Sequence, residues 1–142
     1  MFVLLVHCFL PAEGRDKTYC GKHGRSMNTG NFEDALRAYW KVRDGDAVAD
    51  TPEFRIDGNK AGEGAIEEFI ETKEPCRKIR IYLSLEGTNS EAKRDTDRAD
   101  VIEAIDELVK CAGSRNSSTK GGYVQRDGIK YDFDVLKRYD GC

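Results

Sequence analysis

Hydrophobic and polar residues follow two spacings along this chain, and each spacing predicts a kind of secondary structure. Residues 2–10 are almost continuously apolar, which is typical of a strand that is covered on both faces. The segment 78–86 instead alternates, which predicts a strand with one buried face and one wet face. Its buried positions are Ile79, Ile81, Leu83 and Leu85, and its outward positions are Lys78, Arg80, Tyr82, Ser84 and Glu86.

Apolar residues three to four positions apart predict three helices. Their apolar faces consist of Phe32, Ala35, Leu36, Tyr39 and Trp40 in the first, Ala65, Ile66, Phe69 and Ile70 in the second, and Val101, Ile102, Ile105, Leu108, Val109 and Ala112 in the third. We expect Asn31 to cap the first helix and Gly45 to end it. The second must end before Pro75, because the residue before a proline avoids the helical region, and Gly113 is suited to end the third. All three apolar faces, including Phe69, are expected to lie in the core.

The C-terminal part of the chain predicts a loop followed by a hairpin. Residues 114–122 are small and polar, as in an exposed connection, and residues 123–126 and 129–133 flank Asp127-Gly128, which suits a two-residue turn. A short strand is also expected near residues 54–56. Together the elements predict a single compact α+β domain over residues 1–142. Its sheet would be mixed or largely antiparallel with residues 1–10 at the centre, three helices packed mainly on one face, and a C-terminal β-hairpin.

Composition and charge narrow the classes of partner. Of the 142 residues, 39% are hydrophobic and 35% are charged, which places the chain among soluble globular proteins and not among disordered ones. The net charge of −3, with basic residues scattered along the chain, argues against nucleic acid as the main partner. The apolar run at residues 2–10 is too short to span a bilayer, so no membrane association is expected. A targeting segment is the alternative, but no basic residue precedes the run and no small-residue cleavage site follows it.

The pattern of the five cysteines predicts a reducing compartment. An odd number cannot pair completely, and the spacing of Cys8, Cys20, Cys76, Cys111 and Cys142 shows no disulfide framework, so a cytoplasmic protein is expected. Cys8 and Cys111 fall in apolar patterns and are expected to be small buried side chains.

The spacing of Cys20 and His23 is typical of two metal ligands. It would also suit a catalytic pair made of a thiol and a neighbouring base. Zinc needs further close ligands, which the chain does not supply, and no third group is evident that would orient a catalytic pair. The run Gly21-Lys22-His23-Gly24 also resembles the backbone-clamping loop of KH domains, but in that family a helix follows the loop directly. No catalytic residue and no metal site are therefore predicted here.

The segment Asp57 to Glu68 resembles an EF-hand calcium loop at its first, third, sixth and twelfth positions, which are Asp57, Asn59, Gly62 and Glu68. Ala61 offers no side-chain oxygen at the fifth position, and no second loop is present to form a pair. The segment is therefore expected to be a polar turn, and the protein is expected to bind no cofactor.

Two functions fit these observations. The first is a non-catalytic protein that binds another macromolecule through a protein–protein surface, as small inhibitors and accessory subunits do, many of them encoded by phages and mobile elements. The alternative is a small enzyme acting on a nucleotide or phosphate ester. It would combine the Lys22/His23 loop with the acidic residues Asp95, Asp97 and Asp100, and these two segments would have to meet in one cleft. The lack of a complete catalytic motif favours the binding protein.

A binding surface is predicted on the wet face of the strand 78–86, beside the hairpin and the basic loop. Its residues are Lys22, Arg80, Tyr82 and Lys130. Tyrosine and arginine are the residue types that dominate protein–protein hot spots, which favours this face over the charged outer faces of the helices.

Overall fold

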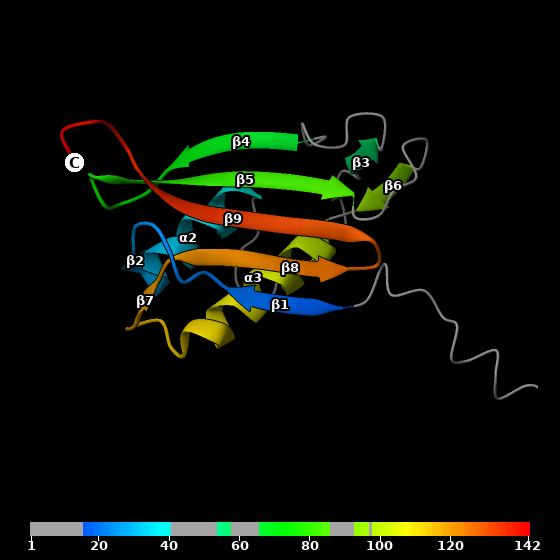
Figure 1. Cartoon of the computed structure of the whole chain (residues 1–142), viewed down its shortest axis with the longest axis horizontal. Coiled ribbons are helices and arrows are strands. Elements are labelled where there is room, and N and C mark those ends of the chain that lie inside the picture. Colours follow the sequence, from blue (N-terminus) through cyan, green and yellow to red (C-terminus); the bar gives the residue numbers. More distant parts are fainter. Residues whose placement is uncertain (1–15, 41–53, 58–65, 86–92, 97) are drawn as a thin grey trace, which may run out of the picture.

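The computed structural model describes residues 16–40, 54–57, 66–85, 93–96 and 98–142. Within them, five strands form one sheet in the order β1-β8-β9-β5-β4, and every neighbouring pair is antiparallel (Figure 1). These strands are β1 (Lys17–Cys20), β4 (Ile66–Glu71), β5 (Arg77–Leu85), β8 (Gly121–Arg126) and β9 (Ile129–Lys137). The predicted α+β class with a largely antiparallel sheet is confirmed.

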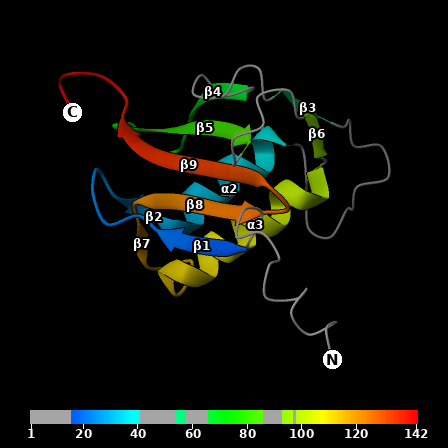
Figure 2. The same ribbon diagram turned by 45° about the vertical axis from the view of Figure 1, so that its right-hand side comes forward.

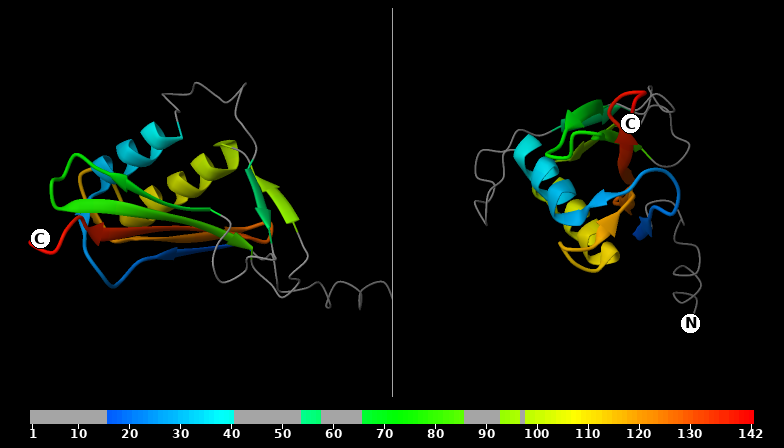
Figure 3. Two further views of the ribbon diagram at one scale, coloured as in Figure 1. Left: turned by 90° about the horizontal axis from the view of Figure 1, so that it is seen from above. Right: turned by 90° about the vertical axis from the view of Figure 1, so that its left-hand side faces the viewer.

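Both helices of the described residues, α2 (Thr29–Tyr39) and α3 (Arg98–Ala112), pack on the same face of this sheet (Figure 3). The remaining strands form two short pairs, β2 (Met27–Asn28) with β7 (Ser118–Thr119) and β3 (Phe54–Asp57) with β6 (Lys93–Thr96). Seen at an angle, β9 crosses the middle of the sheet, with the helices behind it (Figure 2). No described helix covers the opposite face.

The core lies between the helices and the inner face of the sheet. Strands β5 and β9 alternate between buried and partly exposed residues, as the sequence of β5 predicts. Their buried side chains, such as Ile81 and Phe133, join Leu36 of α2 and Ile105 of α3 in one apolar cluster. Each such fully buried side chain contributes roughly 1.5–3 kcal/mol.

The predicted C-terminal hairpin is present, and its turn has the expected geometry. Strands β8 and β9 pair from Arg126 opposite Ile129, with Asp127 and Gly128 between them at φ values of 54° and 82°. Positive φ at both central positions is the condition for the tight turn that matches the twist of the strands.

The second predicted helix is wrong, because residues 66–71 form the edge strand β4. The short run containing Ile66, Phe69 and Ile70 fits a helical spacing, but Ile66 and Ile70 also fit an alternating one, and short apolar runs cannot distinguish the two. Pairing with the strongly alternating β5 decides between them, since Ile70 lies opposite Ile79 and Phe69 opposite Arg80. This register turns Phe69 away from the helices, and its side chain is 53% exposed instead of lying in the core.

Two boundaries also differ from the sequence prediction. Asn28, not Asn31, caps α2, because the Asn28 side chain accepts a hydrogen bond from the backbone N–H of Asn31 at 2.9 Å. The polar stretch 114–122 is only partly a loop. Thr119 pairs with Met27, and Gly121 begins β8, where it is buried beneath neighbouring backbone.

Several predictions fall on residues outside the described ranges. These include the strand at 1–10 and the middle of the calcium-loop-like segment at 58–65. The prediction that the first helix continues to Gly45 is wrong, because α2 ends at Tyr39 with Trp40 as its C-cap. The centre of the described sheet is β9, which has β8 on one side and β5 on the other. No helix in the described ranges is long and apolar enough to cross a bilayer.

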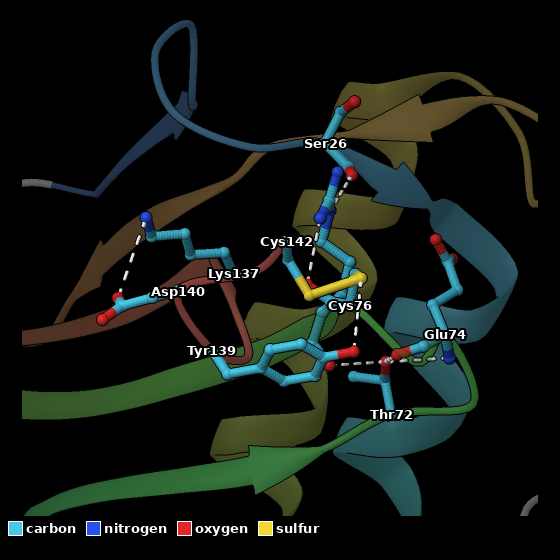
Figure 4. The surroundings of a disulfide bond; sticks show 9 residues. Ser26, Thr72, Glu74, Cys76, Lys137, Tyr139, Asp140 and Cys142 are labelled. Atoms are coloured by element: carbon cyan, nitrogen blue, oxygen red, sulfur yellow. Dashed lines mark hydrogen bonds and ion pairs between the residues drawn. A yellow bond between two sulfur atoms is a disulfide. The ribbon is translucent and has the colours of Figure 1, made fainter.

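The expectation of unpaired cysteines is wrong for four of the five. Cys20 of β1 is joined to Cys111 of α3, with 5.9 Å between their Cα atoms, and Cys76 is joined to Cys142, with 5.4 Å between theirs. Figure 4 shows the second pair beside Tyr139, whose hydroxyl oxygen lies 4.0 Å from Cys76 Sγ. The partners are 91 and 66 residues apart in sequence, so only the tertiary fold brings them together. Cys8 lies outside the described residues.

Candidate binding surface

The face of the sheet opposite the helices carries polar and aromatic side chains from all five strands, and we call it the open face. Alternation along each strand and the pairing register place them there. They are Lys17 and Tyr19 on β1, Tyr123 and Gln125 on β8, Lys130, Asp132 and Asp134 on β9, Lys78, Arg80 and Tyr82 on β5, and Glu67, Phe69 and Glu71 on β4.

Cations lie against the aromatic rings of the open face. The rings of Tyr19 and Tyr123 stack with their centroids 5.1 Å apart, and Lys130 Nζ lies 4.4 Å from the centroid of Tyr123. On the neighbouring part of the face, Arg80 Cζ lies 4.3 Å from the centroid of the Tyr82 ring. Such contacts contribute about 0.5–1 kcal/mol each at exposed sites and hold both rings and cations in place.

A pair of carboxyl groups occupies the centre of the open face. Asp132 lies on the central strand, directly opposite Tyr123 on one side and Tyr82 on the other. Burial raises the pKa of Asp132 to about 7, and both its hydrogen bond with Asp134 and the charge of Asp134 act in the same direction. The cations Lys130 and Arg80 oppose this shift without cancelling it.

Arg80 links the carboxyl pair to the edge of the sheet. Its guanidinium Nε donates to Glu67 Oε2 at 2.7 Å, and its Nη1 lies 3.5 Å from Asp134 Oδ2. Arg80 is therefore already engaged by carboxylates on both flanking strands. The open face presents its charges as a connected network rather than as separate side chains.

The structure brings together three of the four predicted binding residues. Arg80, Tyr82 and Lys130 all lie on the open face, with Lys130 opposite Ser84 of β5. Lys22 does not join them. It follows β1 and lines a separate hollow of about 490 Å³ at the C-terminal end of α3, together with Cys111 and Lys120.

The centre of this surface is formed by residues that were not predicted from the sequence. Asp132 and Asp134 were not considered, although residues 129–137 alternate as clearly as the strand 78–86 and could have revealed them. Tyr19 and Tyr123 are joined only by the pairing of β1 with β8, which the sequence does not disclose.

The two segments of the alternative enzyme do not meet. The loop with Lys22 and His23 begins after Cys20, which the disulfide holds to Cys111 near the end of α3, whereas Asp100 lies in the first turn of that helix. Cys111 lies eleven positions after Asp100 along the helix, which corresponds to about 16 Å. Because Cys20 is a disulfide partner, it is not available as a zinc ligand or as a nucleophile beside His23.

The described residues offer no evident metal site. No group of three or more histidine, cysteine, aspartate or glutamate side chains is arranged to hold an ion within them. Glu68, which would close the calcium-loop-like segment, lies in β4 opposite Ile81, whereas an EF-hand loop closes at the start of a helix.

Comparisons with protein-family models, with curated proteins and with solved structures find no match to this chain.

Proposed function

We propose that this protein is a non-catalytic binding protein that contacts another protein through the open face of its sheet. The observation that supports this most directly is the row of Tyr123, Asp132 and Tyr82 across three strands, with cations against both rings. Rigid aromatic groups next to arginine form the most productive contacts in protein interfaces. Acting as an inhibitor or an accessory subunit would require no chemistry beyond such a surface.

The charges of the open face favour a protein partner over a nucleic acid. The four acidic residues Glu67, Glu71, Asp132 and Asp134 match the four cations Lys17, Lys78, Arg80 and Lys130 in number, so the face stays close to neutral even when Asp132 and Asp134 share one proton. A phosphate backbone would be repelled by the central carboxyl pair, and single-stranded nucleic acid needs free aromatic rings on which bases can stack. Here Tyr123 already lies between Tyr19 and Lys130.

Site-specific photo-crosslinking can test this proposal. A photoreactive phenylalanine analogue at Gln125 would sit on the open face, and the same analogue at Asn116 would sit on the exposed loop after α3 as a matched control. We expect one defined protein to be crosslinked from position 125 and not from position 116. The double variant Tyr82→Ala/Lys130→Ala should prevent that crosslink, whereas Lys110→Ala/Asn116→Ala should not.

These variants spare the ion pairs of Arg80, so the fold should be retained. Tyr82 and Lys130 are half-buried and each makes one cation–π contact, so the double variant should lose about 1–2 kcal/mol and remain folded, which urea unfolding can check. Equal crosslinking from both positions, or a crosslink that persists in the folded double variant, would exclude the open face as the site. Crosslinking to nucleic acid instead would contradict the choice of partner.

The compartment is a second part of the proposal. The sequence alone led us to expect a cytoplasmic protein, but two disulfides that close long loops favour an oxidising compartment, where such bonds form and persist. In an oxidising compartment, the apolar residues 2–10 would act as a targeting segment and not as a buried strand.

Thiol trapping in intact cells distinguishes the two compartments. Free thiols are alkylated before lysis, and the modified cysteines are identified by mass spectrometry. We expect Cys20, Cys76, Cys111 and Cys142 to escape alkylation. Full alkylation of these four residues would show instead that the protein resides in a reducing compartment.

A further inference from the structure

Strand β4 ends the sheet, and its outer edge has no strand partner within the described part of the chain (Figure 1). An edge of this kind presents backbone N–H and C=O groups that another extended segment can pair with. With six residues, Ile66–Glu71, it is long enough to form a ladder with such a segment.

The hydrogen-bond pattern identifies which backbone groups point outward. The N–H of Arg138 donates to the C=O of Cys76 at 3.0 Å, which directs the even-numbered residues of β5 toward β9 and the odd-numbered ones toward β4. Ile79 and Ile81 therefore bond to Ile70 and Glu68, their partners in register. The N–H and C=O groups of Glu67, Phe69 and Glu71 consequently point away from the sheet.

The surroundings of this edge are acidic. Three of the six residues of β4 are the exposed glutamates Glu67, Glu68 and Glu71. Glu67 is paired with Arg80, whereas Glu68 lies on the helix side, close enough to Tyr39 for its charge to add to the burial that raises the pKa of that hydroxyl. Carboxylates therefore flank the edge both on the open face and on the face that packs against the helices.

A groove runs beside the end of β4, against the first helix. It has a volume of about 250 Å³, and it is lined by Asn31, Asp34, Ala35 and Ala38 of α2 and by Glu71, Thr72 and Lys73 at the end of β4. The small side chains of Ala35 and Ala38 leave room there for a side chain of a segment added beside β4.

We propose that an extended segment of another protein, rich in lysine and arginine, binds as an added strand along the outer edge of β4. Its backbone pairs with Glu67, Phe69 and Glu71, its cationic side chains lie beside the glutamates, and one further side chain enters the groove between α2 and β4. The interaction shares Glu67, Phe69 and Glu71 with the open face, but it depends on the backbone edge of β4 and not on Tyr82 or Lys130, so it can be tested separately from the function proposed above.

A second copy of the chain fits this edge less well. Antiparallel pairing of two β4 strands centred on Phe69 would place Glu67 of each copy opposite Glu71 of the other. Like charges directly opposite each other on neighbouring strands are destabilising, whereas a basic segment would neutralise them.

Amide hydrogen exchange measured by NMR tests the proposal on the intact, disulfide-bonded protein. In the free protein, the amides of Glu68 and Ile70 should be protected, whereas those of Glu67, Phe69 and Glu71 should exchange rapidly. The probe is an eight-residue peptide of alternating lysine and valine with blocked ends. Adding it should slow the three outward amides, and the same peptide with glutamate in place of lysine should not. Binding should weaken as the salt concentration rises.

Two substitutions at one position separate backbone pairing from charge. Phe69→Pro removes an outward N–H while leaving every carboxylate in place, and proline is tolerated on edge strands whose N–H faces solvent. It should weaken peptide binding by about tenfold, while Phe69→Ala, which keeps the N–H, should bind nearly as the parent does. The open-face variant Tyr82→Ala/Lys130→Ala should also bind the peptide normally.

Three results would overturn the proposal. The outward amides could already be protected in the free protein, the peptide could bind Phe69→Pro as tightly as the parent, or it could protect the open face instead of β4. Should Phe69→Pro fail to fold, the exchange pattern of the parent protein still decides the question. Dimerisation of the parent without peptide, with protection of the same three amides, would assign the edge to a second copy.

Discussion

Asp132 and Asp134 lie two residues apart on the central strand and are hydrogen-bonded to each other on the open face. Two carboxyl groups so close together cannot both ionise at low cost, and partial burial of Asp132 increases that cost. The pair therefore retains one proton at a pH where isolated aspartates are ionised. This makes the centre of the proposed binding surface sensitive to pH near neutrality.

Stability should fall as the pH rises from about 4 to 7. The pKa of Asp132 is raised to about 7 in the folded protein, compared with about 3.9 when unfolded, so the folded state favours the protonated group. The stabilisation is complete below the unfolded pKa and is lost as the pH rises through the folded one. Asp132→Asn, which cannot ionise, should therefore be more stable than the parent above pH 7, by roughly 1–2 kcal/mol after allowance for solvent and coupling.

Urea unfolding at pH 4, 5.5 and 7.5 measures this difference. Asp127→Asn is the matched control, because Asp127 is exposed in the hairpin turn and asparagine tolerates its positive φ. The control should follow the parent at every pH. If Asp132→Asn and the parent keep a constant difference from pH 4 to 7.5, the carboxyl pair does not hold a shared proton.

Calcium should not stabilise the protein. Glu68 would have to supply the closing bidentate ligand of an EF-hand loop, but β4 holds it in register with Ile81, and Ala61 has no side-chain oxygen to offer. A ligand that binds only the folded state raises Tm by mass action, so millimolar calcium and chelator should give the same Tm within error. A Tm that rises with calcium concentration would show that the loop binds the ion in spite of this register.

Both disulfides should contribute strongly to stability, since they close loops of 91 and 66 residues in sequence separation. The paired variants Cys20→Ser/Cys111→Ser and Cys76→Ser/Cys142→Ser should each lose roughly 2–5 kcal/mol of unfolding free energy. Intact mass before and after reduction should differ by four hydrogens if only these two bonds are present. A parent whose unfolding curve is unaffected by reductant would contradict both pairings.

The strands whose alternation is long could be predicted, and the pairings between distant segments could not. Strand β5 and the hairpin turn at Asp127 were recognised because nine alternating residues and a two-residue turn signal are local. Strand β4 was mistaken for a helix, since six residues around Phe69 satisfy both periods and only pairing with β5 selects one.

The same limit applies to the candidate surface. Arg80, Tyr82 and Lys130 were placed correctly on one face because each lies on a strand with clear alternation. Lys22 lies apart from them, and its position depends on the disulfide from Cys20 to α3. Contacts between residues more than sixty positions apart leave no local pattern in the sequence.

Gly121 and Gly113 form a matched pair for the last prediction, because both have positive φ but differ in the space around them. At Gly113, with φ of 106°, a Cβ atom would have no neighbour within 4 Å, so Gly113→Ala should cost only the backbone strain of about 1–2 kcal/mol. At Gly121, with φ of 81°, a Cβ atom would lie 2.0 Å from the carbonyl oxygen of Phe133. That oxygen belongs to the neighbouring strand β9, so relief requires β8 and β9 to separate at this position, and Gly121→Ala should cost at least about 3 kcal/mol. Urea unfolding of both variants with the disulfides intact makes the comparison, since the unfolded reference is then the same. Equal losses in the two variants would show that β8 does not approach β9 as closely as described.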